Sequence, residues 1–376
     1  MIVYEYKGNP EIGNIANPLM TIAMIMYNRK EYVKDAVESL LKQDYPNLEI
    51  VISDDNSNDG ATEIALDLVK AYKGRHRIVV NVNERNLGLG GNFAKALALS
   101  RGEWVVACGG DDVQHNDRVS QVLRYAREYP SAVIIGSGAN TVDSRGVMNG
   151  EWGVTDPFLY KKYHEGDLHF ASGNTADKNA TMSVACGATA AYRKDLCELF
   201  PFPNDVWCED LVMDLRGIQF GDILLIPEKL VDYRVHNQSV SYRRENVTGR
   251  EARRKLRNKS ASNVYVSYKG ALGEAFRLQA GDVNGFVSTL CYETARWLLW
   301  CFKEGDASER VSLYVSAYKI ARKRFSFLTL MRGAEGRGVL WCFLTVAFRA
   351  FFCRDRGCGN FMEKLGIAIV NQKGGL

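Results

Sequence analysis

Paired cysteines are missing from this sequence of 376 residues. Its nine cysteines form no CxxC motif and no close Cys/His group, which argues against a zinc site and favours reduced thiols over a disulfide framework. Long apolar runs are also missing: the nearest candidate, residues 339–348, stops at Arg349, well short of the roughly 20 residues of a membrane span. The first residues, MIVYEYKGNPEIGN, lack the uninterrupted apolar segment of a signal peptide. We therefore expect a cytoplasmic protein.

The sequence also has little excess of charge of one sign. The formal net charge of +4 does not by itself indicate nucleic acid, so we expect no nucleic-acid partner. Near residue 240 the composition changes: YRRENVTGREARRKLRNKS is strongly basic, and helices rich in Trp, Phe and Leu are predicted after it. We predict an N-terminal extension (1–17), a large domain (18–240) and a helical C-terminal region (241–376). Two readings of the last region stay open: peripheral contact with anionic lipid at the cytoplasmic face of a membrane, or packing on the large domain or a second subunit, including a homo-oligomer.

Strand and helix patterns alternate between residues 20 and 136. Strands are predicted over TIAMIMY, LEIVISD, RIVVNVN, EWVVAC and AVIIGS, and helices over NRKEYVKDAVESLLKQ, ATEIALDLVKAY, NFAKALALSRG and DRVSQVLRYAREY. A capping box between Asn28 and Glu31 is expected to open the first helix. This repetition, with short connections, predicts an α/β fold with a mostly parallel sheet covered by helices on both faces.

Two acidic clusters follow predicted strands, where ligands of such sheets bind. The first, SDDNSNDG, is not a calcium loop, because its twelfth position is Leu66 and not glutamate. Alone it indicates a polar turn. The second contains Asp111 and Asp112, which suit a hard divalent cation, although a surface turn is an equally good reading of that stretch alone. Because neighbouring carboxylates repel each other, we expect positive groups close to this pair.

Two further motifs are weaker alone. The segment WCED places Glu209 and Asp210 before a predicted helix, where both could simply complement the helix dipole. The segment YRVHNQS contributes His236, and a lone histidine is more often structural than a ligand.

Taken in order, these segments resemble family 2 glycosyltransferases of the GT-A fold over roughly residues 18–241. The stretch IAMIMYNRKEYVKDAVESLLKQDYPNLEIVISDDNSNDGAT is similar to the nucleotide-binding entry of the family, and GGDDVQHNDRV stands where the family has its metal motif. The later segments CGATAAYRKDL, CED and YRVHNQSVS resemble the acceptor-side strand, the catalytic motif and the closing segment. Two residues depart from the pattern: Gly109 replaces the first aspartate of the metal motif, and Gln114 replaces an apolar or aromatic residue.

The resemblance implies roles for particular residues. Asp210 would be the general base, with Glu209 beside it, while Tyr27 would stack on the nucleobase and Asp54 would accept a nucleobase N–H. The full set of nucleotide-binding candidates is Tyr27, Asn28, Asp54, Asn56, Asn92 and Asp111. For Mn²⁺ or Mg²⁺ the candidates are Asp111 and Asp112, and we add His236 because its imidazole suits manganese. We further expect weak metal binding without nucleotide, and a Gly109→Asp variant that is tolerated or binds metal more tightly.

The implied activity is an inverting, metal-dependent transfer of sugar from a nucleotide-diphosphate sugar to a saccharide or lipid-linked acceptor, in surface polysaccharide or glycolipid synthesis. The chemistry agrees, because a leaving diphosphate needs a Lewis acid and an acceptor hydroxyl needs a base. One alternative is a non-catalytic nucleotide-sugar-binding or scaffold homologue in a polysaccharide-synthesis complex, suggested by Gly109. Another is a nucleotidyltransferase, although YNRKEY lacks the glycine-rich phosphate loop expected of one. The donor sugar, the nucleobase, the acceptor and the oligomeric state stay open.

Overall fold

The computed structural model describes residues 1–8, 17–160, 185–199, 202, 206, 209–237 and 239. All of these residues belong to one compact unit. The predicted C-terminal region (241–376) lies outside the described residues, so its helices and the boundary near residue 240 stay predictions. None of the helices in the described ranges combines the length and apolarity needed to cross a bilayer.

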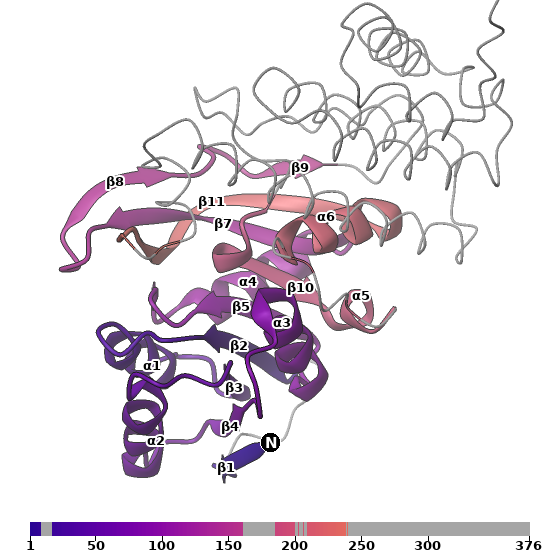
Figure 1. The fold of residues 1–376 in the computed structure, drawn as a ribbon. Helices are drawn as coiled ribbons and strands as arrows, with labels where there is room; N and C mark the ends of the chain where they lie inside the picture. Colours follow the sequence, from indigo (N-terminus) through magenta and orange to yellow (C-terminus); the bar gives the residue numbers. More distant parts are fainter. Residues whose placement is uncertain are drawn as a thin grey trace, which may run out of the picture. The chain divides into compact units, whose positions relative to one another are not determined.

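Four parallel strands form the first half of the sheet, in the order β4-β3-β2-β5. They are β2 (Met20–Met26), β3 (Leu48–Asp54), β4 (Arg77–Val82) and β5 (Trp104–Gly109). The connecting helices are α1 (Val33–Leu41), α2 (Ala61–Ala71) and α3 (Gly88–Leu99). The chain moves outward through α1 and α2 and then returns through α3, so right-handed crossovers place α3 on the opposite face from the other two (Figure 1). The predicted alternation of strands and helices is confirmed here.

The second half of the sheet is mixed. Strand β10 (Ala190–Arg193) runs antiparallel to both β5 and β7 (Ala132–Val142), and the long strand β11 (Asp222–Arg234) runs parallel to β7. The smaller strands are β6 (Val113–Gln114), β8 (Met148–Trp152) and β9 (Phe158–Tyr160), and the remaining helices are α4 (Arg118–Glu128), α5 (Lys194–Glu198) and α6 (Glu209–Phe220). Strand β1 (Ile2–Tyr6) pairs antiparallel with β4, so part of the predicted N-terminal extension is an edge strand of the sheet.

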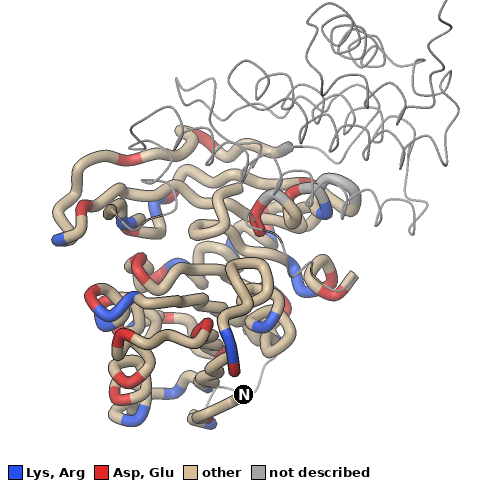
Figure 2. The backbone as a smooth tube through the Cα atoms, viewed as in Figure 1, with Lys and Arg blue, Asp and Glu red and all other residues tan. Residues whose placement is uncertain are grey.

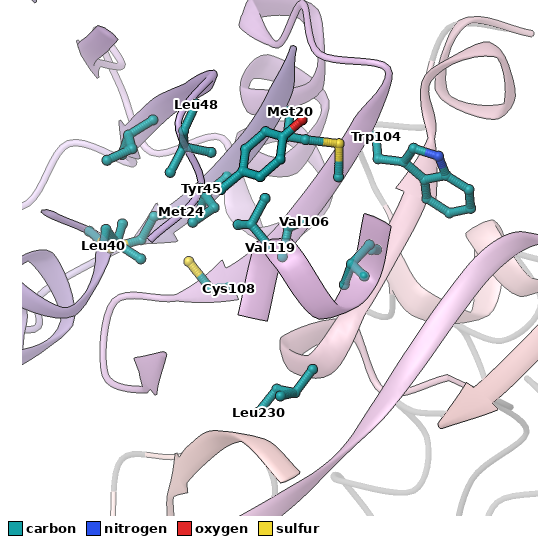
Figure 3. Close-up of a cluster of buried hydrophobic side chains, with 14 of the residues drawn as sticks. Met20, Met24, Leu40, Tyr45, Leu48, Trp104, Val106, Cys108, Val119 and Leu230 are labelled. Carbon is teal, nitrogen blue, oxygen red and sulfur yellow. The ribbon is translucent and has the colours of Figure 1, made fainter. Parts of the chain in front are cut away.

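The core lies between the parallel strands and their helices (Figure 3). Met20, Met24 and Leu48 from β2 and β3 are fully buried, as is Leu40 of α1. Tyr45 belongs to the same cluster, and its hydroxyl donates a hydrogen bond to the carbonyl of Pro18 at 2.6 Å. Burying each large apolar side chain contributes about 1.5–3 kcal/mol. This packing holds β2, β3 and β5 against their helices.

The predicted capping box at the first helix is wrong. Helix α1 begins at Val33, and no side chain caps its first turn. Asn28 instead has a left-handed backbone (φ 51°), and its side-chain oxygen accepts the N–H of Asn58 at 2.9 Å. The acidic loop after β3 thus engages Asn28, which ties this loop to the end of β2.

Candidate functional site

Three neighbouring parallel strands end at one edge of the sheet. In the sheet register Met26 of β2 pairs with Asp54 of β3, and Ile25 pairs with Gly109 of β5, so their carboxyl ends lie side by side. The long strand β11 reaches this edge from much later in the chain and ends at Arg234. The segments that follow β2, β3, β5 and β11 therefore begin at one edge of the sheet, which local patterns alone do not establish.

Asp111 is the carboxylate at this edge that contacts both an arginine and a histidine. Its Oδ2 accepts a hydrogen bond from Arg29 Nε at 2.8 Å and lies 3.0 Å from His236 Nε2. The Asp111 side chain keeps 17% of its surface exposed, whereas that of His236 keeps 1%. Burial acts to raise the pKa of Asp111, but the hydrogen bond from His236 and the charge of Arg29 together hold this pKa below its ordinary value. Asp111 is therefore an anionic and partly accessible carboxylate.

Asp112 has a different environment. It is buried, and its Oδ1 accepts the backbone N–H of Arg234 at 2.9 Å. Burial, and then the neighbouring charge of Asp111, raise the pKa of Asp112 well above its ordinary value. A carboxylate must lose its proton to bind a metal, so Asp112 is less suited to that role than Asp111.

The predicted metal ligands are only partly brought together. Asp111 Oδ2 and His236 Nε2, 3.0 Å apart, fit two adjacent ligands of an octahedral ion, because metal–ligand bonds of about 2.1 Å at a right angle separate ligand atoms by about 3 Å. The residues present thus fit a divalent cation at Asp111. Within the described ranges, however, no group of three or more His, Cys, Asp or Glu residues is arranged as a metal site. The ligand set that includes Asp112 stays a prediction.

The expected positive groups next to the two aspartates are confirmed. Besides Arg29, Arg234 donates from Nε to the backbone carbonyl of Asp111 at 2.9 Å. Arg118 is fully buried, and its charge acts to lower the pKa of Asp112. Burial lowers the pKa of Arg118 itself only to about 10, so it remains cationic at neutral pH. Acidic and basic residues are interspersed over the rest of the described fold (Figure 2), so the balance of charge at the site is local.

The first acidic cluster forms the polar turn that its sequence indicates. Asp54 is fully buried, and its oxygens accept hydrogen bonds from the Ser57 backbone and hydroxyl and from Thr62 Oγ1. Asp55 accepts the N–H groups of Leu87 and Gly88, which open helix α3. The oxygens of Asp54 are thus engaged within the protein, and its nucleobase contact stays a prediction.

The other nucleotide-binding candidates divide by exposure. Asn92 is buried: its side-chain oxygen accepts from Ser53 Oγ at 2.7 Å, and its amide donates to the Ser53 carbonyl at 3.0 Å. These bonds hold α3 against β3, which is a structural role. Tyr27, in contrast, is 44% exposed just after β2, and Asn56 is exposed in the loop after β3. Asn28 is half-buried between these two loops.

Glu209 and Asp210 lie in the first turn of α6 and are half-buried. The backbone N–H of Gly187 donates to Asp210 Oδ2 at 3.4 Å, and a side chain at residue 187 would collide with Glu209. Burial, and then the charge of Asp210, raise the pKa of Glu209 to about 8. Glu209 thus carries its proton at neutral pH, which leaves Asp210 as the better candidate for a base.

Cys186 lies close enough to both Asp112 and Asp210 to feel their charges. This half-buried residue has a thiol whose pKa is raised, chiefly by desolvation, and the charges of both Asp210 and Asp112 raise that pKa further. Both carboxylates therefore lie within electrostatic range of Cys186. Sequence analysis did not select this residue, nor Arg29, Arg118 or Arg234, and the only available signal was their presence inside or beside the quoted motifs.

Comparisons with known proteins show what this chain is similar to. Residues 21–200 match the family model described as glycosyl transferase family 2. An uncharacterised protein of Mycobacterium bovis is 24% identical over 224 residues, which cover 59% of this chain and 60% of that protein. An uncharacterised glycosyltransferase of Haemophilus influenzae is 23% identical over 292 residues, covering 73% of this chain and 85% of the relative. The chain thus spans only about 60% of the length of its mycobacterial relative.

Among solved structures, that of S. aureus TarS 1–349 in complex with UDP-GlcNAc matches with a TM-score of 0.47 and 17% identity. The match covers 88% of this chain and 91% of that chain.

Proposed function

We propose that this chain is a family 2 glycosyltransferase of the GT-A fold, which transfers a sugar from a nucleotide-diphosphate sugar to a hydroxyl group with inversion. The match of residues 21–200 to the family model and the parallel sheet support this proposal. One observation carries the proposal: Arg29, Asp111 and His236, from three separate segments, meet at the carboxyl edge of the sheet. An anionic, partly exposed carboxylate with two nitrogen groups beside it suits a charged diphosphate and its cation.

At the donor side, exposed Tyr27 would stack on the nucleobase, and the neighbouring loops after β2 and β3 would surround the ribose. Asp111 and His236 would hold Mn²⁺ or Mg²⁺, with Asp112 completing the set if it loses its proton. When bound, the ion would stabilise the negative charge that develops on the leaving nucleoside diphosphate. Arg29, Arg118 and Arg234 reduce the repulsion between the carboxylates and the incoming phosphates.

At the acceptor side, Asp210 would take the proton of the attacking hydroxyl. A single displacement with one base produces inversion, so a second nucleophilic carboxylate is not required. Glu209, protonated at neutral pH, would be available as a hydrogen-bond donor to the acceptor or to Asp210.

A second candidate function is a non-catalytic homologue that binds a nucleotide sugar or serves as a scaffold in a polysaccharide-synthesis complex. The observation that favours it is the orientation of Asp112, which bonds to the Arg234 backbone and has a raised pKa. Together with Gly109, this leaves Asp111 as the carboxylate of the second acidic cluster whose pKa is lowered rather than raised. The partly exposed Asp111 and the position of Asp210 favour the enzyme.

A panel of UDP, GDP, dTDP and CMP sugars distinguishes the two candidates. We expect one class of nucleotide sugar to raise the melting temperature in the presence of Mn²⁺ and to be hydrolysed slowly without acceptor. Stabilisation without hydrolysis, also when saccharide and lipid-linked acceptors are added, would favour the scaffold. Melting temperatures unchanged by every sugar would contradict both.

For the setting, we propose synthesis of a surface polysaccharide or glycolipid at the cytoplasmic face of a membrane. The basic run within residues 241–376 supports peripheral contact with anionic lipid. Co-sedimentation of the full chain with anionic vesicles at low and high salt tests this. If no salt-sensitive binding is seen, the region contacts protein instead.

A further inference from the structure

Arg29 is held in place at the end of β2. Its Nε donates to Asp111 Oδ2 at 2.8 Å, while Nη1 donates to the carbonyls of Tyr27 and Asn28 at 3.3 and 3.1 Å. Its own carbonyl accepts the N–H groups of Tyr32 and Val33, where α1 begins. The side chain is 20% exposed. The guanidinium therefore has a defined position on Asp111 and still faces solvent in part.

This position conflicts with a metal ion on the same carboxylate oxygen, Asp111 Oδ2. A carboxylate oxygen offers about two lone-pair directions, and at Asp111 Oδ2 these face Arg29 and His236. The other oxygen, Oδ1, faces the strand end, since a Cβ on Gly109 would lie only 2.8 Å from it. A cation that approaches Asp111 through Oδ2 must therefore displace at least one of the two nitrogen groups.

We propose that Arg29 is a positioning residue that acts as the built-in counter-ion of Asp111 and controls the binding of the divalent cation. Without nucleotide, the guanidinium neutralises Asp111 and competes with the cation. When the diphosphate arrives, the guanidinium transfers from the carboxylate to a phosphate oxygen and frees Asp111 Oδ2. Cation and nucleotide then bind together. The transfer of Arg29 from Asp111 to a phosphate rests on the proposed function.

The chemistry of arginine fits both partners. A planar guanidinium pairs with carboxylates and phosphates through the same N–H groups. Movement from Asp111 to a phosphate thus exchanges one charge-assisted hydrogen bond for another. If Arg29 only stabilised the turn after β2, its replacement would not make a divalent cation bind more tightly at Asp111.

The test is a titration with Mn²⁺ alone, with free Mn²⁺ followed by electron paramagnetic resonance. We expect Arg29→Gln to bind Mn²⁺ about tenfold more tightly than the wild type, in line with loss of one competing charged hydrogen bond. Lys30→Gln is the matched control: it removes the same charge from the next residue, whose side chain lies beside Gly60, 3.6 Å from a Cβ built there. Its affinity should change by no more than about twofold, since exposed charges are screened.

The double variant Arg29→Gln/Asp111→Asn locates the ion. It should lose the gain in Mn²⁺ affinity if the ion binds at Asp111. Equal affinities of Arg29→Gln and wild type, or a gain that persists in the double variant, would overturn the proposal. Because Mn²⁺ alone is the probe, this result stands whether or not a nucleotide sugar binds.

Nuclear magnetic resonance on the wild type gives a second measurement if Arg29→Gln does not fold. The Arg29 Nε–H signal, assigned by its loss in Arg29→Lys, should be protected from solvent exchange in the free protein. Adding Mg²⁺ with the nucleoside diphosphate selected by the sugar panel should shift this signal, as the bond to Asp111 is replaced by one to phosphate. An unprotected signal in the free protein would contradict the counter-ion role. A signal unmoved by bound nucleotide would contradict the transfer, and absence of nucleotide binding in the panel would contradict the proposed function.

Discussion

Replacing Gly109 with aspartate would restore the carboxylate that the family pattern has at this position, and the structure predicts damage rather than gain. A Cβ at residue 109 would lie 2.8 Å from Asp111 Oδ1 and 3.0 Å from Asp112 Oδ2. Both distances are well inside the roughly 3.5 Å at which non-bonded atoms pack favourably. The two carboxylates therefore already occupy the space beside Gly109, which argues against the expectation from sequence that this variant is tolerated.

The size of the effect follows from how firmly the two aspartates are held. Asp111 is fixed by Arg29 and His236, and Asp112 by the Arg234 backbone, so neither can move away without losing a hydrogen bond. Overpacking of this kind costs about 1–3 kcal/mol. A third carboxylate adds repulsion to this cost. We expect Gly109→Asp to lose about 2–3 kcal/mol of unfolding free energy and to bind Mn²⁺ more weakly.

Urea unfolding and Mn²⁺ titration measure both effects, and Gly150→Asp is the matched control. A Cβ at Gly150 would also lie 2.8 Å from a side-chain oxygen, Thr141 Oγ1 of β7, but Gly150 itself is exposed on the edge strand β8, away from the carboxylate pair. Its cost should stay within about 0.5 kcal/mol. An unchanged urea midpoint with tighter Mn²⁺ binding in Gly109→Asp would refute the reasoning and restore the expectation from sequence.

Two further predictions concern the carboxylates of α6. Asp210→Asn should lower turnover by roughly 10²–10⁴-fold, the range for loss of a general base, and should leave donor affinity nearly unchanged. If Asp210→Asn keeps near-normal turnover while Glu209→Gln is inactive, Glu209 is the general base and Asp210 is not. Because the folded-state pKa of Glu209 is raised to about 8, its contribution to stability is full below about pH 4.3 and is lost as pH rises through 8. Wild-type urea midpoints should therefore fall between pH 5 and pH 8.5, and Glu209→Gln should show a smaller fall; parallel curves would disprove the assignment.

Much of the fold could be predicted from local sequence. Apolar runs located β2 to β5, because these strands are buried on both faces, and helical periodicity located α1 to α4, because each helix buries one face in the core. The acidic clusters could be located at strand ends for the same reason, since a buried apolar run must stop where consecutive polar residues begin. The capping box at Asn28 failed because a tertiary contact, the Asn58 N–H, competes for that side chain.

For the site candidates, the sequence could not predict which side chains are exposed or which groups they hydrogen-bond. Asn92 and Asp54 are chemically suitable for nucleotide binding, but their polar atoms are used inside the protein. Nothing in their neighbouring residues distinguishes them from exposed Tyr27 or Asn56. Whether a polar side chain faces a ligand or a neighbouring loop depends on how the loops pack, and that is a tertiary property.

The sequence by itself determined the order of the elements, the two acidic motifs and the need for positive charge beside Asp111 and Asp112. Only the tertiary structure decided which groups supply that charge. Strand β11 pairs with β7 and delivers Arg234 and His236 to the end of β5, more than 120 residues after Asp111 in the chain, while the turn after β2 delivers Arg29. Like charges that are buried together require a counter-charge. Which residues supply that counter-charge depends on the order of the strands, and this order is set by strand pairing across the whole sheet.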